Sequence, residues 1–299
     1  MLTSFHTGTT PTTKIVHLQY HQRKSMMPPS VHDLITDDIL AVAYEWLVQR
    51  RRNYPDSADI WSFRRHWPSE RRRLGDELLA GTYQFSLLTR VTLATGNDID
   101  LWAARDALVL KCLTLVLSQH LPRSPQCFHL KTEGEQKKGV KAARDSIQTA
   151  IADHRFVLRT DVKSYYASIS HQRLLADLTL QIQDKRLLNL LAQYLSRSAE
   201  RGGLFWSYKR GIPLACSLSP LLGGFFLYGL DTAMTHSNVF YLQYMDDILV
   251  LTPTRNALRR AVRVVNRHFD DLDLEKHPDK TFIGRIERGF NFLGVHYPH

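Results

Sequence analysis

The chain has 299 residues, 43% of them apolar and 23% charged, which is ordinary for a globular protein long enough to bury a sizeable core. Its net charge of +10 favours nucleic acid over a membrane as the partner, with a merely solvated basic surface as the alternative. Three widely spaced cysteines, Cys112, Cys127 and Cys216, argue against a disulfide framework and favour a reducing, cytoplasmic location.

Two other kinds of site are disfavoured by local patterns. Cys127 and His129 have a metal-like spacing, but no second Cys/His pair accompanies them, so we expect no zinc site. Residues 212–230 carry no charge and are about long enough to span a bilayer. Because a Ser219-Pro220 turn and two adjacent glycines interrupt this run, we interpret it as a buried helix rather than a membrane span.

The first half of the chain predicts mainly helices. Residues 1–30 are rich in Thr, His and Pro without any period, which predicts a flexible extension. Helices are expected over 33–52, 103–119 and 138–152, and a strand pair over 83–102 that turns at 95–98. Three arginine clusters, at 50–52, 64–65 and 71–73, alternate with aromatic residues. Base stacking beside phosphate contacts explains this alternation, and so does a helical surface with aromatic core anchors.

Strand patterns dominate the second half of the chain. The expected strand segments are 156–162, 239–244, 248–251, 282–286 and 290–297, of which the last two are expected to pair as a hairpin. Ser170 and Thr254 are suitable N-caps for two helices that lie between these strands.

The central feature of the sequence is the pair Asp246-Asp247, which lies between two apolar strands. An ordinary surface turn accommodates aspartates, but adjacent carboxylates at the edge of a core are stable mainly when a cation neutralises them. A third acid, Asp161, ends another apolar strand upstream. Three carboxylates on neighbouring strands predict a site for two Mg²⁺ ions, with Mn²⁺ as an alternative, of the kind used for in-line phosphoryl displacement.

Five segments resemble motifs A to E of reverse transcriptases. They are, in chain order, 161–169 (motif A), 211–231 (motif B), 244–247 (Tyr-Met-Asp-Asp, motif C), 276–281 (motif D) and 290–294 (motif E). Their order and spacing are most similar to those of bacterial, group II intron-like enzymes. The resemblance is strong over 155–297 and extends more weakly back to Trp61.

The resemblance implies an α+β fingers–palm architecture, with a small antiparallel palm sheet backed by helices. It implies a flexible extension over 1–30, a helical fingers region over 31–150 and a palm over 151–299, with no thumb within the chain. The implied activity is RNA-templated DNA synthesis, in which dNTPs are joined to a primer 3′-hydroxyl with the help of two metal ions.

The resemblance also assigns roles to the motif residues. Asp161 and Asp246 would ligate both metals, with the Val162 carbonyl and Asp247 as additional ligands. Lys280 would be the acid or the electrostatic partner of the leaving pyrophosphate, against the alternative of a solvated loop lysine.

Other motif residues are implied to shape the nucleotide and primer sites. Tyr166 lies where the family places a bulky ring beneath the sugar C2′, which would exclude a 2′-hydroxyl and select dNTPs; a core tyrosine is the alternative. Gly211 and Pro213 would shape the loop over the nucleotide. The primer end would be positioned by Phe292, Leu293 and Gly294.

Three departures from the family pattern matter. Leu214-Ala215 replaces the Gln-Gly pair that usually follows the motif B proline, which predicts altered nucleotide handling. Residues 93–102 lack the basic side chains that the fingers hairpin usually offers to the triphosphate, and Arg90 or Arg105 are candidate substitutes. Without a thumb, we expect a partner protein or a second chain to complete the grip on the RNA template and the DNA or RNA primer.

Two alternative functions use the same residues. An untemplated or protein-primed nucleotidyl transferase would use the same palm and would differ in its template dependence. A non-catalytic nucleic-acid-binding subunit would have little use for three mutually repulsive carboxylates, although the lack of basic fingers residues favours it. Mobile element, antiviral defence and domesticated host gene are all compatible with the sequence as biological roles.

Overall fold

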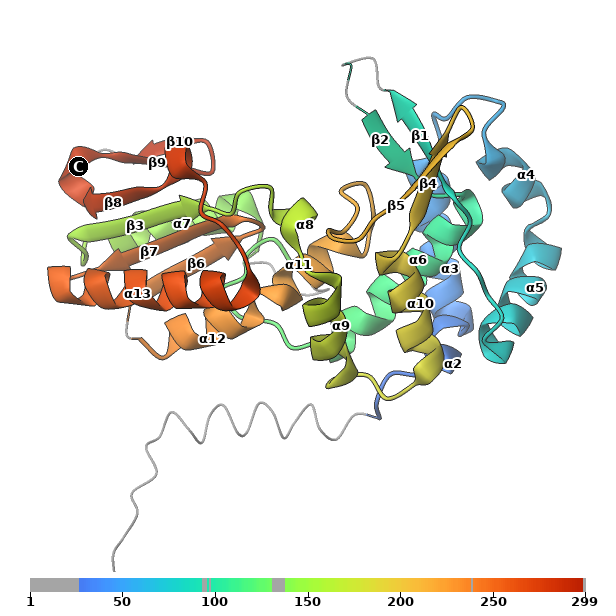
Figure 1. The fold of residues 1–299 in the computed structure, drawn as a ribbon, viewed down its shortest axis with the longest axis horizontal. Helices are drawn as coiled ribbons and strands as arrows, with labels where there is room; N and C mark the ends of the chain where they lie inside the picture. Colours follow the sequence, from blue (N-terminus) through green and yellow to red (C-terminus); the bar gives the residue numbers. More distant parts are fainter. Residues whose placement is uncertain (1–26, 93–95, 97, 131–137, 238, 298–299) are drawn as a thin grey trace, which may run out of the picture.

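The structure is a computed structural model that describes residues 27–92, 96, 98–130, 138–237 and 239–297. Two lobes lie end to end, one rich in helices and the other centred on a sheet (Figure 1). Most of the predicted extension over 1–30 and part of the predicted turn at 95–98 lie outside the described residues.

The central helix of the first lobe is α6 (Ala104–His120), which agrees with the helix predicted over 103–119. Its apolar side chains are buried along most of its length, because neighbouring helices pack around it (Figure 1). These neighbours are α2 (Val31–Leu34), α3 (Asp37–Arg50) and α4 (Asp59–Arg65), and α5 (Trp67–Ala80) packs on the outside of α2 and α4.

The helix predicted over 33–52 is confirmed over most of its length by α3, but its first residues belong to the separate short helix α2. Ser30 and Asp33 form a capping box that begins α2 at Val31. Thr36 then takes the extended N-cap position of α3, and this interrupts the helical backbone between the two segments. The apolar period continues across the break, which is why the sequence pattern concealed it.

The arginine clusters lie on this helical lobe, and part of them is structural. Arg51 is buried, donating to Asp59 and to the backbone carbonyl of Trp102. Phe63, which alternates with the clusters, lies in the core. Phe63 is therefore an aromatic core anchor and Arg51 a structural residue, and neither is available to contact a nucleic acid.

A four-stranded sheet adjoins the helical lobe, with strand order β2-β1-β4-β5. The predicted hairpin is confirmed as β1 (Leu88–Thr92) and β2 (Asp98–Leu101), which pair antiparallel. β4 (Ser198–Arg201) pairs parallel with β1, and β5 (Leu204–Ser207) completes the sheet. The predicted fingers region (31–150) supplies β1 and β2, and the predicted palm region (151–299) supplies β4 and β5. Strands from both predicted regions therefore belong to one sheet.

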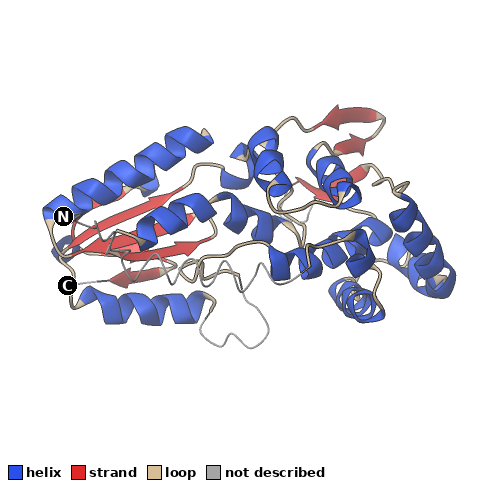
Figure 2. Ribbon diagram, turned by 90° about the horizontal axis from the view of Figure 1, so that it is seen from below, coloured by secondary structure: helices blue, strands red, loops and turns tan. Residues whose placement is uncertain are grey.

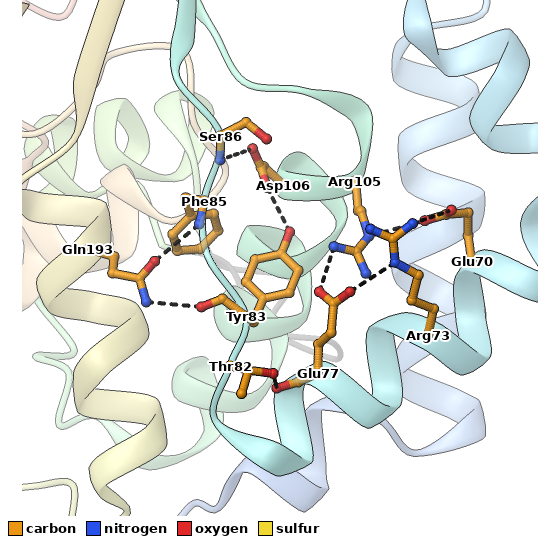
Figure 3. A network of polar contacts seen from close by, with 10 residues as sticks. All are labelled: Glu70, Arg73, Glu77, Thr82, Tyr83, Phe85, Ser86, Arg105, Asp106 and Gln193. Carbon is orange, nitrogen blue, oxygen red and sulfur yellow. Dashed lines mark hydrogen bonds and ion pairs between the residues drawn. The ribbon is translucent and has the colours of Figure 1, made fainter.

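A buried polar network holds the segment that leads from α5 into β1 (Figure 3). The Tyr83 hydroxyl donates to Asp106 Oδ1 at 2.6 Å, and the Ser86 backbone N–H donates to Oδ2 at 3.0 Å. Gln193, from α10 (Lys185–Leu195), bonds to the backbone of Tyr83 and Phe85. Burial raises the pKa of Asp106, so this carboxylate depends on both donors.

The second lobe is built on an antiparallel sheet with strand order β6-β7-β3-β8, which we call the palm sheet. Its strands are β6 (Phe240–Tyr244), β7 (Asp247–Thr252), β3 (Phe156–Asp161) and β8 (Phe282–Arg285). Helices cover both faces (Figure 2). α12 (Tyr228–Thr235) and α13 (Arg255–Leu272) pack on one face, and α7 (Val140–Ile151) lies on the other, where its apolar residues share a core cluster with alternate strand residues.

Both predicted N-caps are confirmed. Thr254 accepts the backbone N–H of Ala257 at the start of α13, and Ser170 accepts that of Arg173 at the start of α9 (His171–Thr179). α9 and the short α8 (Tyr165–Ser168) lie between the two lobes (Figure 1).

The predicted pairing of 282–286 with 290–297 is wrong. β8 pairs with β3, whereas β9 (Phe290–Phe292) and β10 (Val295–Tyr297) pair with each other. The residues that join β9 to β10, Leu293 and Gly294, have φ values of 48° and 74°, which suit a two-residue hairpin turn. The sequence pattern assigned that turn to the wrong pair of strands.

The uncharged run over 212–230 contains a buried helix that begins at Ser219-Pro220, as predicted, although Leu214 before it is exposed. It contains α11 (Ser219–Phe226), in which all residues but one are buried, and the start of α12. Among the residues that the structure describes, no helix has both the length and the apolar character needed to cross a membrane.

Candidate active site

The palm sheet brings the three predicted acids to one of its ends. Asp161, the last residue of β3, lies directly opposite Asp247, the first residue of β7. Asp246 occupies the turn just before Asp247, and its backbone carbonyl accepts the N–H of Val162 at 3.1 Å. Segments that are distant in the sequence thus place their carboxylates side by side through strand register alone.

The motif D segment is bonded to the same end of the sheet. The backbone N–H of His277 donates to the Asp161 carbonyl at 2.8 Å, and Val162 forms a bridge with Lys276. This places Lys280, on the short helix η1 (Pro278–Lys280), so that its Nζ donates to Asp161 Oδ2 at 2.9 Å. Lys280 therefore forms an ion pair with Asp161, another residue to which the motif resemblance assigned a catalytic role.

The electrostatics of the cluster favour an added cation. Burial raises the pKa of Asp246, and the charge of Asp161 raises it further. Burial raises the pKa of Asp247 to about 6, with contributions from the charges of Asp246 and Asp161. Lys280 offsets only part of this repulsion, because it is bonded to Asp161.

We expect Asp247→Asn to change how the stability of the metal-free protein depends on pH. The folded-state pKa of about 6 lies above the ordinary aspartate value of about 3.9. Ionisation of Asp247 therefore costs folding free energy as pH rises from about 4 to 6. The variant should gain stability over the wild type at pH 7.5, by at most about 3 kcal/mol, and only about 1 kcal/mol at pH 4.5.

Urea unfolding in EDTA at the two pH values measures this difference. Asp279→Asn, which removes an exposed carboxylate on η1, is the matched control and should show no pH-dependent gain. Equal gains for Asp247→Asn at pH 4.5 and pH 7.5 would contradict the assigned titration.

The donor set fits divalent metal ions that bind together with a substrate. Within the described ranges, no three His, Cys, Asp or Glu side chains gather closely enough to enclose a metal ion by themselves. Mg²⁺ in phosphoryl-transfer sites is bound by one or two carboxylates and takes its other ligands from substrate phosphates and water. Asp161 and Asp246 line one pocket and supply such a pair.

The turn that carries Asp246 has a strained backbone. Met245 has a φ of 54°, a backbone conformation that residues other than glycine rarely adopt. Two side chains hold it there: His129 Nδ1 accepts the Met245 N–H at 2.9 Å, and Gln243 Nε2 donates to the Met245 carbonyl at 3.0 Å. Both backbone polar groups of the strained residue are therefore bonded, which fixes the position of Asp246 beside it.

His129 was missed as a site residue, because the sequence suggested only a weak metal-ligand spacing with Cys127. Its Nε2 contacts the carbonyl of Pro220 at 3.2 Å, at the start of α11. A ring that accepts at Nδ1 and donates at Nε2 is a neutral imidazole, and burial lowers the pKa of His129 to about 4. This side chain thus joins the motif C turn to the motif B helix. No signal in one sequence would have found it, because the contact depends on segment 126–128 lying beside β6.

We expect His129→Phe to lower the turnover number of nucleotide incorporation, the activity that the motif resemblance implies, roughly tenfold, because it leaves the Met245 N–H without its acceptor in the partly buried turn. The Michaelis constant for the nucleotide should change little, since His129 does not line the pocket. Steady-state extension assays measure both constants. His129→Gln, which retains an acceptor and a donor, should restore part of the rate, whereas the exposed control His236→Phe should leave it unchanged. Equal losses in His129→Gln and His129→Phe would contradict this positioning role.

A pocket of about 540 Å³ lies beside the carboxylates. The predicted site residues among its lining are Asp161, Val162, Tyr166, Gly211, Pro213, Asp246 and Lys280. Asp247 does not line it, although it is next to Asp246 and opposite Asp161. The structure therefore brings together the predicted metal ligands, the predicted sugar-selecting ring and the motif B loop.

Three arginines also line this pocket, and only one of them was anticipated. Arg90 of β1 is paired with Asp100 at 2.8 Å, and Arg210 is paired with Asp273 at 2.6 Å. Arg197 is buried and donates to the Gly211 carbonyl at 2.8 Å. Basic side chains are thus present around the pocket, Arg90 from β1 of the hairpin and the other two from segments outside it.

Arg105, the other candidate for a basic fingers contact, forms ion pairs within the helical lobe and not at the pocket. It forms ion pairs with Glu70 and Glu77 of α5, at 3.1 and 2.8 Å (Figure 3). It does not line the pocket, so of the two candidate substitutes the geometry retains Arg90 alone.

The motif B loop can approach Tyr166 only because Gly211 has no side chain. Its φ is 81°, and an added Cβ would lie 2.8 Å from the backbone of Ala167 and 2.9 Å from the Tyr166 carbonyl. The N–H of Ile212 donates to that carbonyl at 2.7 Å. The loop and the tyrosine are therefore held in one fixed arrangement. The exposed Leu214, which departs from the family pattern, also lines the pocket.

The predicted primer-grip residues form the β9–β10 turn, away from the pocket lining. Phe292 is buried in the palm core, whereas Leu293 and Gly294 are the turn residues. Arg144 of α7 donates to the Leu293 carbonyl, which fastens the hairpin to the sheet lobe.

Comparisons with known proteins identify a family model, a relative and two solved structures that are similar to this chain. A family model described as reverse transcriptase (RNA-dependent DNA polymerase) matches residues 107–297. Protein YkfC of Escherichia coli (strain K12) is 25% identical over 266 residues, which cover 74% of this chain and 69% of that protein. Two solved structures, a partial Cas6-RT-Cas1–Cas2 complex and a Cas6-RT-Cas1–Cas2 complex, each align with a TM-score of 0.47 and 17% identity over 80% of this chain. This chain spans 42% and 26% of those two chains.

Proposed function

The chain belongs to the reverse transcriptase family, and we propose that it is an RNA-directed DNA polymerase that extends a primer 3′-hydroxyl with dNTPs. The observation that carries this proposal is the single pocket in which Asp161, Asp246 and Tyr166 face one space. In this proposal residues 31–150 supply most of the fingers and residues 151–297 most of the palm.

The residues of the pocket divide the work of the reaction. Asp161 and Asp246 would hold two divalent ions, aided by Asp247 and the Val162 carbonyl. Bound there, the ions lower the pKa of the attacking hydroxyl and stabilise the charge of the leaving pyrophosphate. The rigid turn around Met245 keeps one carboxylate in place, so little reorganisation is needed during the reaction.

Lys280 is proposed to change partners when substrate binds. Its bond to Asp161 holds the pKa of the lysine above its usual range, so that the side chain is protonated. With Asp161 engaged in metal binding, Lys280 would be able to donate to an anionic leaving group, as an acid or as a fixed charge. Arg90 and Arg210, already in the pocket wall, are proposed to bind the triphosphate.

Primer extension by the purified chain tests the proposal directly. We expect Mg²⁺-dependent DNA synthesis that requires both an RNA template and a paired primer. Product of equal yield without template would favour an untemplated transferase instead. Preferential incorporation of NTPs would contradict the assignment of DNA as the product.

A further inference from the structure

An arginine-rich groove lies between α13 and β8 in the palm lobe, outside the pocket that holds the carboxylates. Its volume is about 760 Å³. Five arginines line it: Arg255, Arg259 and Arg263 of α13, and Arg285 and Arg288 from β8 and the turn after it. Leu258, Val262 and Ile283 contribute apolar lining, and no acidic residue lines it. We call these five residues and the space between them the arginine groove.

The charges of the groove disfavour the helix on which they lie. Arg255 is the first residue of α13, where the positive end of the helix dipole repels a cation. Arg255, Arg259 and Arg263 follow at intervals of four residues, so they lie on one side and repel one another. The first acid of this helix is Asp270, in its last turn. A polyanion in the groove would relieve all of these repulsions together.

Little within the protein neutralises these side chains. In the described part of the chain, Arg255, Arg259, Arg263 and Arg288 form no ion pair with a carboxylate. Arg285 reaches one, that of the exposed Glu287, at 3.4 Å. All five side chains are exposed, so they can bind an external partner without unfolding any element.

The groove is distinct from the proposed active site. Phe156, the first residue of β3, lines the groove, whereas Asp161, the last residue of the same strand, lines the pocket. Five residue-to-residue steps of extended strand separate them, which is about 17 Å. A ligand in the groove would therefore leave the pocket open.

We propose that the arginine groove binds the sugar–phosphate backbone of a nucleic acid outside the polymerase cleft. A polynucleotide carries one negative charge per nucleotide, so one short stretch neutralises all five arginines. Guanidinium groups bind phosphate oxygens through two parallel hydrogen bonds, and the apolar lining can contact sugars or bases. An acidic peptide would need an uninterrupted run of acids to give the same match.

Two double variants on the same helix test the proposal. Arg259→Gln/Arg263→Gln removes two groove arginines. Arg260→Gln/Arg267→Gln removes two exposed arginines of α13 that do not line the groove, with the same change in net charge. Binding of a short RNA hairpin, and of a DNA hairpin of the same sequence, is followed by fluorescence anisotropy over a series of salt concentrations.

We expect the groove variant to bind the RNA hairpin on the order of tenfold more weakly at low salt, with the slope of log affinity against log salt reduced by about 2. The control pair should change neither quantity appreciably. A loss confined to RNA would identify RNA as the ligand, and a loss with both hairpins would indicate recognition of the backbone alone.

Equal losses in the two variants would overturn the proposal, because they would reflect net charge and not the groove. Unchanged hairpin binding by the groove variant, with lost binding of polyglutamate, would also overturn it and point to an acidic protein segment. Hairpin binding requires no catalysis, so this result is independent of the polymerase assignment.

Discussion

Replacing Asp246 with asparagine should lower the rate of primer extension at least about 1000-fold. The change removes one negative charge and nearly preserves the shape of the side chain. In the proposed mechanism it thereby removes a ligand of the metal ions, which would contribute several kcal/mol of transition-state stabilisation, and each 1.4 kcal/mol corresponds to a tenfold rate change. Asp161→Asn should cause a similar loss, because Asp161 faces the same pocket.

Single-turnover extension with saturating protein and Mg²⁺ measures this rate without interference from weak binding. Asp279→Asn is the matched control, since it removes an exposed acid on η1 that does not line the pocket. The variants should remain folded, and Asp246→Asn should lose the Mg²⁺-dependent rise in melting temperature expected in the presence of dNTP. A rate within tenfold of the wild type would refute the assignment of Asp246 as a metal ligand.

The backbone of this site was largely predictable because its information is local. Short apolar runs predicted the strand that contains Asp161 and the strand that follows Asp247, and the strand register then placed the two acids opposite each other. Ser170 and Thr254 were identified as N-caps for the same reason, since a cap depends only on the next three residues.

The supporting contacts were not predictable, because they join segments that are distant in the sequence. His129 reaches Met245 across more than one hundred residues, and Arg197 reaches the motif B loop from the end of α10. The sequence offered Arg90 only as one of two candidates, and the sheet order β2-β1-β4-β5 is what brings it to the pocket. One sequence records none of these pairings, since each partner is an ordinary residue for its own local structure.

The roles of the basic residues could not be predicted from composition either. The net charge of +10 is spread over arginines with different environments. Arg51 is buried and Arg105 is paired with α5 carboxylates, so neither is available to a polyanion. Arg90 lines the pocket while paired with Asp100, and Arg259 lines the exposed groove without an ion-pair partner. Only the last two kinds of arginine can contribute to binding, which is why composition alone gave an undecided prediction.

Replacing Tyr166 with alanine should reduce the preference for dNTPs over NTPs on the order of 100-fold. The ring lines the pocket and is packed on two sides. Tyr165 packs edge-on against it, with 5.4 Å between the ring centroids, and the backbone of Gly223 lies so close that an added Cβ would be 3.4 Å from the Tyr166 ring. Burial raises the pKa of Tyr166 to about 12, so the ring is neutral and acts by its shape. Removing it would open room for a 2′-hydroxyl while leaving the carboxylates in place.

The ratio of kcat/KM for a dNTP to that for the matching NTP, on one primer–template, measures this preference. Tyr166→Phe keeps the ring and should retain the wild-type ratio. Tyr165→Phe removes only the hydroxyl that donates to the Gly223 carbonyl in the core, and should also leave the ratio unchanged. If Tyr166→Ala lowers the melting temperature but preserves the ratio, then Tyr166 is a core residue, and selection of the sugar must lie with the motif B loop, where Leu214 and Ala215 replace the usual pair.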